Sequence, residues 1–357
     1  MSNPPWTCPV CAARLTPTTD GRSWHCLNRH SFDVARQGYL SLMTGARHPL
    51  GDTATMVRAR ADFLAAGWFE PIVATIAELI RRWETATFHN GPSAGESRPW
   101  LADLGGGSGY YSVELLRQLP GWRGALVDAS TNAVKVAARA ASRLTASGQP
   151  PEARPVPKHD PSTGEEPGLA GACADDWPGM SSHGGPRLAV ACADLWAGVP
   201  LATNSIDIAL DIFAPRHPAE IGRVLRPVGL AIVVTPRPDH LHQLRQSLPL
   251  MGIEADKESR LRQQFSDFRL VEHQIIEYGC LLPTQAIAQV ISMGPNGFHA
   301  SADQIAAMAA GLSESGPINT RVAVDVWGFG DGAGGQDERH RPGEHHHIAD
   351  EVVTKSG

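Results

Sequence analysis

The sequence has little of what marks membrane, secreted or disulfide-stabilised proteins. It holds no run of about 18 apolar residues, so we expect no membrane-spanning helix. Its first residues, Met1 to Trp6, lack the basic stretch and apolar segment of a secretory signal. Six cysteines in 357 residues are too few for the disulfide framework of a small secreted domain. These absences predict a cytoplasmic protein, and the length fits roughly two domains.

Positive charge is scarce overall and uneven along the chain. The formal net charge is −6, so binding to nucleic acid would need a local basic surface. One candidate is 1–68, which has seven arginines and no lysine against four aspartates, an excess of about three positive charges. Only four of the 31 basic residues in the whole chain are lysines. A GC-rich genome would produce the same preference for arginine, so this preference alone does not indicate an RNA-binding surface.

Hydrophobic periodicity divides the chain into three parts. Residues 1–45 predict a compact module with short extended pieces, and 46–99 a helical connector, broken near Gly67, that ends in a polar linker. From 100 to 329 strands alternate with helices, which predicts an α/β domain with a parallel sheet covered on both faces. We expect strands at 100–104, 124–127, 187–192, 206–212, 229–235 and, at the edge of the sheet, 322–329. We expect helices at 51–83, 111–119, 132–145, 219–225, 240–248, 259–265 and 301–312.

Two segments do not fit this plan. Residues 149–187 contain eight prolines and six glycines in 39 positions, which is too rich in breakers for packed structure. We interpret them as a disordered insertion in a surface connection. The polar tail at 330–357 carries His345 to His347, and we interpret it as disordered and without a metal site.

A glycine-rich turn follows the strand expected at 100–104 and precedes a helix. Its pattern, Asp103-x-Gly105-x-Gly107-x-Gly109, allows positive φ angles and a close approach of the backbone to a ligand. Asp128 ends the next strand, where a carboxylate would accept hydrogen bonds from ribose hydroxyls. Nicotinamide dinucleotide sites use a related glycine spacing, so such a site and a purely structural turn remain alternatives.

These residues resemble the cofactor loop of class I S-adenosylmethionine (SAM) methyltransferases. The resemblance implies a Rossmann-like parallel sheet and a SAM site in which Gly105, Gly107 and Gly109 form the loop. Asp103 would be the acid before the loop, and Asp128 the ribose-binding carboxylate. Asp194, after the third strand, occupies the acidic position beside the adenine, although an aspartate at a strand end is often only a helix cap.

Near the amino terminus, Cys8, Cys11, Cys26 and His30 form the pattern C-x2-C-x14-C-x3-H. Four such ligands in two close pairs suit tetrahedral Zn²⁺, and a full set of protein ligands predicts a structural ion. A module of about 45 residues has too little core to fold alone, so the metal would supply the missing free energy. A redox C-x-x-C pair and unliganded thiols are the alternatives, and His25 could replace His30 only with awkward geometry because it adjoins Cys26.

The zinc pattern and several downstream stretches together resemble the RlmA-type family of 23S rRNA guanine-N1 methyltransferases. The similar stretches are Cys8 to Cys11, Cys26 to Leu42, Gly51-Asp52, Met56 to Ala66, Asp211 to Pro215, Glu220 to Gly229 and Thr235 to Leu241. The match covers roughly 6–145 and 187–300, and departs at the proline-rich insertion and the tail. The resemblance implies SAM and zinc as cofactors and a homodimer. The resemblance implies methylation of a guanine in hairpin 35, and the family splits between nucleotide 745 and nucleotide 748. The arginine- and alanine-rich composition suits a GC-rich actinomycete and so favours the 748 branch, which protects against mycinamicin- or tylosin-like macrolides.

Methyl transfer to guanine N1 requires an unpaired or flipped base beside the methyl donor. We expect Phe213 and Pro215, at the end of the fourth strand, to shape that pocket, although Phe213 could equally be core. Asp211 is the nearest acid, but its side chain could face away, so no proton acceptor is assigned. Arg14, Arg22, Arg29 and Arg36 would contact RNA phosphates. Tyr39 would stack on a base or pack between the module and the helix.

Two other functions fit the same motifs. The chain could be a SAM-dependent enzyme that acts on a small molecule, or a zinc-stabilised protein that binds SAM without catalysis. The arginines of the zinc module favour the RNA methyltransferase, because an enzyme for a small molecule more usually has a helical lid at that position.

Overall fold

The computed structural model describes residues 3–44, 52–87, 98–144, 186–247, 257–294, 301–312 and 318–329. Nearly all of the insertion expected at 149–187, and all of the tail at 330–357, lie outside these described residues. Most of the linker expected before Trp100 lies outside them as well.

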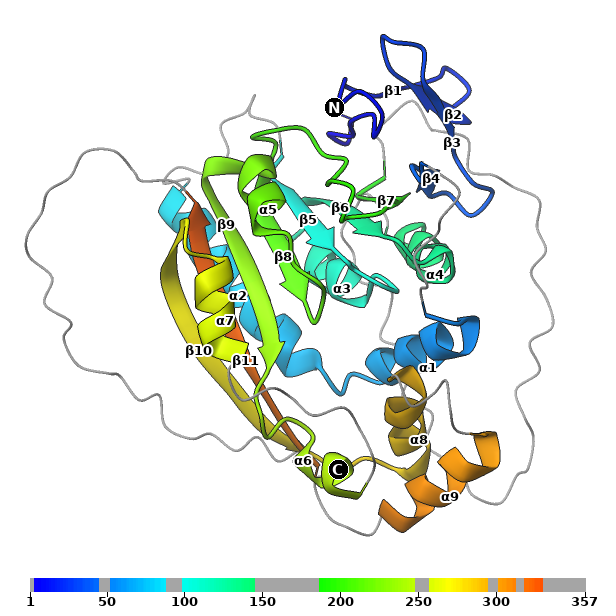
Figure 1. The fold of residues 1–357 in the computed structure, drawn as a ribbon, viewed down its shortest axis with the longest axis vertical. Helices are drawn as coiled ribbons and strands as arrows, with labels where there is room; N and C mark the ends of the chain where they lie inside the picture. The colour runs from blue at the N-terminus through cyan, green and yellow to red at the C-terminus, as the bar shows by residue number, and fades with distance from the viewer. Residues whose placement is uncertain are drawn as a thin grey trace, which may run out of the picture.

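One large sheet dominates the described chain, as predicted (Figure 1). Strand β11 is antiparallel to both of its neighbours, and the remaining strands run in one direction. The central strands are buried along their whole length, as expected for parallel strands covered on both faces. The strands lie in the order β10 (Phe268–Cys280), β11 (Ile318–Phe329), β9 (Leu225–Pro236), β8 (Ile206–Ile212), β5 (Trp100–Leu104), β6 (Arg123–Asp128), β7 (Leu188–Cys192) and β4 (Leu40–Ser41).

Two hydrophobic cores lie on opposite faces of this sheet. The larger core packs against α2 (Glu70–Thr87), α3 (Tyr110–Gln118) and α4 (Thr131–Ala141). The smaller core packs against α5 (Pro218–Val224), α7 (Lys257–Gln264) and the amino-terminal module. The alternation of strand and helix therefore gives the layered α/β domain that the sequence predicts.

Further helices lie beyond the carboxyl ends of the strands. Figure 1 shows α8 (Thr284–Met293) and α9 (Ala302–Leu312) beyond the arrowheads of β8 and β9, with α1 (Ala54–Ala65) next to α8. The short α6 (His242–Ser247) follows β9. Gly67, at φ +80°, separates α1 from α2 at the predicted break. Among the described helices none is by itself long and apolar enough to cross a bilayer; α1 and α2 would be together, but they meet at a bend of 72°.

The amino-terminal module is joined to the large domain by its backbone. Its own sheet consists of β1 (Thr16–Pro17), β2 (Ser23–His25) and β3 (Ser31–Asp33), at the end of Figure 1 opposite to α8 and α9. Strand β4, from the same module, pairs with β7 at the edge of the large sheet. Thr7 N also donates to Pro200 O at 3.0 Å. The module is therefore attached both to the sheet edge, through β4, and to the segment that follows β7, through Thr7.

The structure differs from the predicted elements in the last third of the chain. Strand β10 and helix α8 were not expected from the sequence, and β11 is an internal strand between β9 and β10 rather than an edge strand. Along β10 exposed residues, including Arg269 and Glu277, alternate with partly buried ones, so no continuous apolar run marks it. By contrast, β11 is buried along most of its length, which is typical of a strand with neighbours on both sides.

Candidate functional site

The four predicted metal ligands lie together at one end of the amino-terminal module. Their ligand atoms are all within 4.8 Å of one another. His30 Nδ1 is 3.5 Å from the sulfur of Cys8 and 3.5 Å from that of Cys26, and the sulfurs of Cys11 and Cys26 are 3.7 Å apart. A tetrahedral zinc, with bonds of about 2.3 Å to sulfur and about 2.0 Å to nitrogen, has ligand edges of about 3.5–3.8 Å. The distances therefore fit zinc.

Local backbone turns bring these ligands together. Cys8 O accepts a hydrogen bond from Ala12 N, and Cys26 O accepts one from Arg29 N. Ala12 and Arg29 have φ angles of 56° and 64°, so each turn reverses sharply beside a ligand pair. A backbone hydrogen bond from Ala13 is the main cause that lowers the pKa of Cys11 to about 6, which favours the thiolate that binds metal. His25, the weaker alternative to His30, instead directs Nε2 toward Thr16 Oγ1 at 3.5 Å.

The glycine turn has the backbone geometry that its sequence predicts. Gly105, Gly107 and Gly109 have φ angles of +77°, +56° and +80°, which bulky residues rarely adopt. A Cβ on Gly106 would lie 2.7 Å from both Asp103 Cγ and Leu126 Cδ1, so this position also excludes a side chain. Around Gly107, by contrast, an added Cβ would meet nothing within 4 Å. The turn therefore leaves its backbone open on one side, where a ligand can approach.

Asp128 lies at the carboxyl end of β6, directly beside this turn. Its Oδ2 accepts a hydrogen bond from Gly107 N at 2.9 Å, and its Oδ1 accepts one from Ser130 N at 2.7 Å. Burial raises the pKa of Asp128, and the two backbone hydrogen bonds oppose that shift. Each oxygen keeps a further lone pair, so the carboxylate can accept hydrogen bonds from a vicinal diol such as ribose.

The two other predicted cofactor acids occupy different positions. Asp103 is 1% exposed and accepts a hydrogen bond from Ser112 Oγ, so its carboxylate supports the turn against Gly106. Burial raises the pKa of Asp103 to about 6. Asp194 lies just beyond β7, and its Oδ1 accepts a hydrogen bond from Trp196 N at 2.9 Å. This bond closes a local turn and not the helix cap that was the alternative, since the described residues between Asp194 and β8 contain no helix, and the adenine contact stays a prediction.

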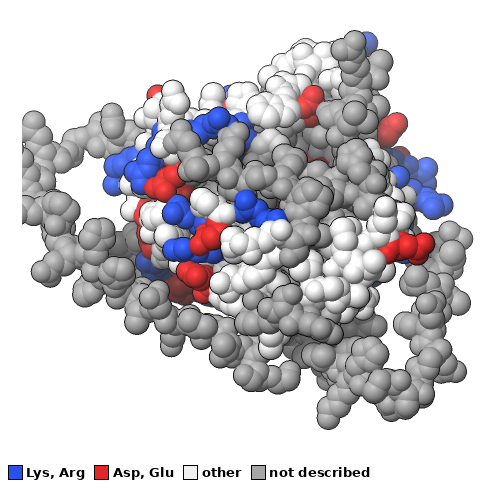
Figure 2. Space-filling model, turned by 60° about the horizontal axis from the view of Figure 1, so that its bottom comes forward, with Lys and Arg blue, Asp and Glu red and all other residues white. Residues whose placement is uncertain are grey.

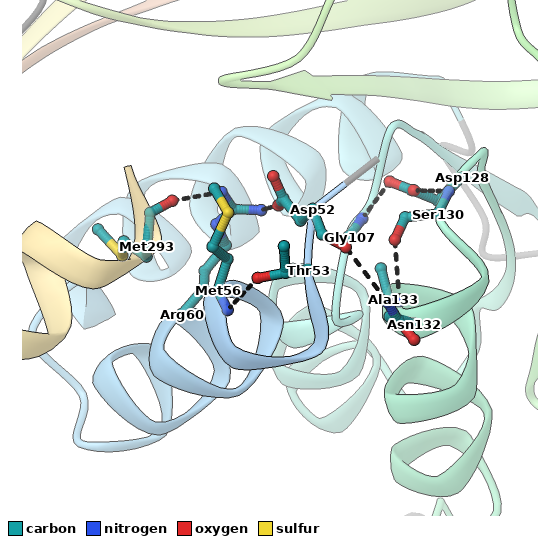
Figure 3. A network of polar contacts seen from close by, with 10 residues as sticks. All are labelled: Asp52, Thr53, Met56, Arg60, Gly107, Asp128, Ser130, Asn132, Ala133 and Met293. Carbon is teal, nitrogen blue, oxygen red and sulfur yellow. Dashed lines mark hydrogen bonds and ion pairs between the residues drawn. The ribbon is translucent and has the colours of Figure 1, made fainter. Parts of the chain in front are cut away.

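A second group of residues borders the glycine turn, and none of the sequence motifs gives these residues a role. Figure 3 shows Asp52 and Arg60, at the start of α1 and within it, near Gly107 and Asp128. Arg60 pairs with Asp52 and donates from Nη2 to Met293 O, at the end of α8, at 2.9 Å. Asn132 Nδ2 donates to Asp52 O at 3.3 Å. The sequence signals were Gly51-Asp52 and Met56 to Ala66, which contains Arg60, within the RlmA-like stretches, and spacing alone could not place them beside Asp128.

Phe213 follows β8 at the same carboxyl edge of the sheet. Phe213 is 38% exposed and its φ is +54°. The turn that carries it packs on the glycine turn, since a Cβ on Gly105 would lie 2.8 Å from the Cβ of Ala214. Phe213 is therefore not a fully buried core residue. Pro215 is two residues further along this turn, and its contact with substrate stays a prediction.

Asp211 lies on the face of the sheet opposite to the larger core. Along β8 it alternates with Leu210 and Ile212, which belong to the larger core, so its side chain points to the opposite face. It is 1% exposed and forms an ion pair with Arg216 Nε at 3.3 Å. Burial raises its pKa to about 7, and Arg216 opposes the shift. The carboxylate of Asp211 is therefore paired with Arg216, but the charge of Asp103 and a backbone hydrogen bond from Ala214 also act on it, and a catalytic role for Asp211 stays a prediction.

The predicted RNA contacts divide into exposed and buried residues. Arg14, Arg22, Arg29 and Arg36 are all exposed. Tyr39 is 7% exposed and belongs to the larger core, so the structure supports its packing alternative and leaves no ring face for a base. Elsewhere, Figure 2 shows blue and red side chains alternating on the side that carries α7 and β10, where Arg237 and Arg262 both pair with Glu258. That face is not a single-sign basic surface.

Known proteins resemble this chain along most of its length. Residues 6–46 match the family model described as RlmA, N-terminal. A 23S rRNA (guanine(748)-N(1))-methyltransferase of Streptomyces fradiae is 33% identical over 321 residues, which cover 89% of this chain and 95% of the relative. The chain belongs to the 23S rRNA (guanine-N1)-methyltransferase family. A Micromonospora griseorubida relative, provisionally assigned the same guanine-N1 activity, is 30% identical over 323 residues, or 89% of this chain and 94% of the relative.

Membership in this methyltransferase family confirms the predicted enzyme class, with SAM and zinc as cofactors. The RlmA-type resemblance is confirmed as well. The nicotinamide alternative and the non-catalytic alternative are therefore set aside. The assignment of single residues to the methyl donor, the base and the RNA backbone stays a prediction.

Proposed function

We propose that this methyltransferase transfers the methyl group of SAM to N1 of a guanine in 23S rRNA. The observation that supports this most is the contact between two turns: the glycine turn, open on one side beside Asp128, packs against the turn that carries the half-exposed ring of Phe213. A donor cradle and an aromatic surface at one sheet edge are what transfer to a base requires.

The chain's own residues would hold the two reactants in line. SAM supplies an activated methyl group on its sulfonium when bound. Asp128 would accept hydrogen bonds from the ribose, and the backbone at Gly107 leaves room for the rest of the donor. Phe213 would stack on the flipped guanine and exclude water from one of its faces. Asp211 is not proposed as the proton acceptor for guanine N1, because its carboxylate lies on the other face of the sheet.

The amino-terminal module would contact RNA at a distance from the methyl donor. Its four exposed arginines, Arg14, Arg22, Arg29 and Arg36, are suited to phosphates. The module and helices α8 and α9 lie at opposite ends of the molecule in Figure 1, so an RNA that reaches both would run along the sheet edge. A substrate that contacts both the module and the glycine turn would be a folded RNA rather than a small molecule. A homodimer, as the RlmA-type resemblance implies, stays a prediction.

We further propose hairpin 35 as the target and nucleotide 748 as the methylated guanine, with macrolide resistance as the consequence. The support is the printed specificity of the Streptomyces fradiae relative, at 33% identity. The reaction would then take place in the cytoplasm, where ribosomes are assembled.

The test is methyl transfer by the full chain loaded with zinc. Labelled SAM is supplied together with naked 23S rRNA or with a small-molecule extract, and the labelled product is digested and identified. We expect label in 1-methylguanosine from the RNA and none in the extract. Label in the extract alone would favour the small-molecule enzyme, and label in another nucleoside would overturn the assignment of N1. Gly106→Ala serves as a control that should lose the donor site.

A further inference from the structure

Three rings from distant parts of the chain meet at the end of β8. The ring of Phe213 lies 6.1 Å from that of His240, at an interplanar angle of 27°, and 6.1 Å from that of Phe69, at 50°. His240 and Phe69 are 8% and 4% exposed, whereas Phe213 is 38% exposed. Phe213 thus has one side supported by buried rings and another open to solvent.

Phe213 keeps an unusual backbone conformation in this position. Its φ of +54° is one that a bulky residue rarely adopts, and its backbone N donates to Val234 O at 3.1 Å. Such conformations persist where the surroundings over-determine them, and they gather at functional sites. A phenylalanine held partly exposed here, next to the glycine turn, indicates that its open face has a binding role.

His240 is fixed from the sheet. It follows β9, its backbone N donates to Arg237 O at 2.9 Å, and its Nδ1 accepts a hydrogen bond from Arg321 N, on β11, at 3.2 Å. This hydrogen bond to Nδ1 sets the orientation of the imidazole plane. The plane in turn lies nearly parallel to the ring of Phe213.

We infer that His240 is a positioning residue of the methyl-acceptor site, whose imidazole supports the ring of Phe213 so that its open face receives the target guanine. This inference rests on the proposed function. A purine is the occupant that the geometry favours, because an aromatic face beside the donor turn offers stacking area rather than charge. His240 does not itself touch the base.

Two variants separate the ring of His240 from its hydrogen bond. His240→Phe keeps an aromatic ring and loses the acceptor for Arg321 N, whereas His240→Asn keeps an acceptor and loses the ring. We expect His240→Asn to raise KM for a hairpin-35 transcript about five- to tenfold, with a smaller change in kcat. His240→Phe should rescue KM to within about threefold of wild type. The opposite ranking would show that only the hydrogen bond matters and would overturn the inference.

Further measurements distinguish the possible failures. SAM affinity and thermal unfolding show whether each variant is folded. If His240→Asn does not fold, a transcript with 2-aminopurine at the target position replaces it: wild type should quench the fluorescence by stacking, and Phe213→Leu should quench it less. Equal quenching would overturn the inference.

A pH–rate profile that differs between His240→Phe and wild type would show that His240 acts as a proton acceptor, and would also overturn the positioning role. A wild-type protein that methylates no rRNA would refute the proposed function itself, which is a different outcome.

Discussion

The donor side and the acceptor side of this site are built in different ways. The donor side is one continuous turn, Asp103–Gly109, closed by Asp128, and its shape comes from backbone angles and two backbone hydrogen bonds. The acceptor side joins rings at positions 69, 213 and 240, which come from distant parts of the chain and meet by side-chain packing, with His240 oriented by a hydrogen bond from Arg321 N. A donor shared by many enzymes can be held by backbone, whereas a particular base requires side chains. The two sides should therefore respond differently to substitution.

The largest effect is expected from adding one methyl group to the donor turn. In Gly106→Ala the new Cβ would overlap Asp103 and Leu126, each at 2.7 Å, so the turn must shift. We expect SAM affinity, measured by calorimetry, to fall at least about 100-fold, or about 3 kcal/mol. Gly121→Ala is the matched control, since nothing lies within 4 Å of its added Cβ. Unchanged affinity in Gly106→Ala would show that the turn is not held by its backbone.

The buried acid of the donor side predicts a pH dependence of stability. Burial raises the pKa of Asp103 to about 6, so between about pH 4 and pH 6 the folded protein holds a proton that the unfolded chain has released. Raising the pH through this range should therefore cost stability, by about 3 kcal/mol for this group. Denaturant unfolding of the protein without SAM at pH 5 and pH 7.5 should show a smaller loss in Asp103→Asn than in wild type. Asp211, with its pKa of about 7, also titrates near this range, and because the charge of Asp103 helps to raise the pKa of Asp211, Asp103→Asn should reduce that contribution in the same direction.

The two partly buried acids that follow β6 and β7 should differ from each other. Asp128 accepts two backbone hydrogen bonds beside the glycine turn, whereas Asp194 accepts one within its own turn. We expect Asp128→Asn to weaken SAM binding by about 2 kcal/mol, because a charged acceptor for the ribose is lost. Asp194→Asn should cost about 1 kcal/mol or less. Equal losses in a calorimetric titration would mean that Asp194 contacts the adenine, as the class I resemblance implies.

The smallest effect concerns the RNA side alone. The double variant Arg29→Ala with Arg36→Ala should weaken binding of a hairpin-35 transcript and lower its log–log salt slope by about one to two, while SAM affinity stays unchanged. The control is Arg262→Ala, which removes an exposed charge from α7, outside the amino-terminal module. Filter binding at several salt concentrations measures the slopes. Identical slopes for the double variant and the control would remove the module from RNA recognition.

Local spacing explains what the sequence could predict. Cys8 to His30 and Asp103 to Gly109 are short-range patterns whose chemistry is set by residue type and separation, and the structure brings each set together. The sheet order is also typical of its strand and helix alternation. Strand β10 could not be predicted because Arg269 and Glu277 interrupt its apolar pattern, and its neighbour β11 was therefore taken for an edge strand.

Orientation and long-range packing explain what the sequence could not predict. The side chains of Asp211 and Tyr39 have the chemistry that the predicted roles require. The sequence does not show which face of the sheet Asp211 occupies, because that depends on the alternation along the strand relative to the core. Nor does it show that packing covers Tyr39. Asp52 and His240 are 76 and 27 residues away in sequence from the partners that define them, Asp128 and Phe213. Only the fold brings these residues together.

Reverse transcription of the RNA tests the account most directly. Wild-type enzyme and SAM are incubated with 23S rRNA, and a primer is extended across hairpin 35. A methyl group on N1 blocks base pairing, so we expect a strong stop next to nucleotide 748 that requires both enzyme and SAM. Read-through identical to that of untreated RNA, with no new stop elsewhere in the molecule, would contradict the proposed methylation.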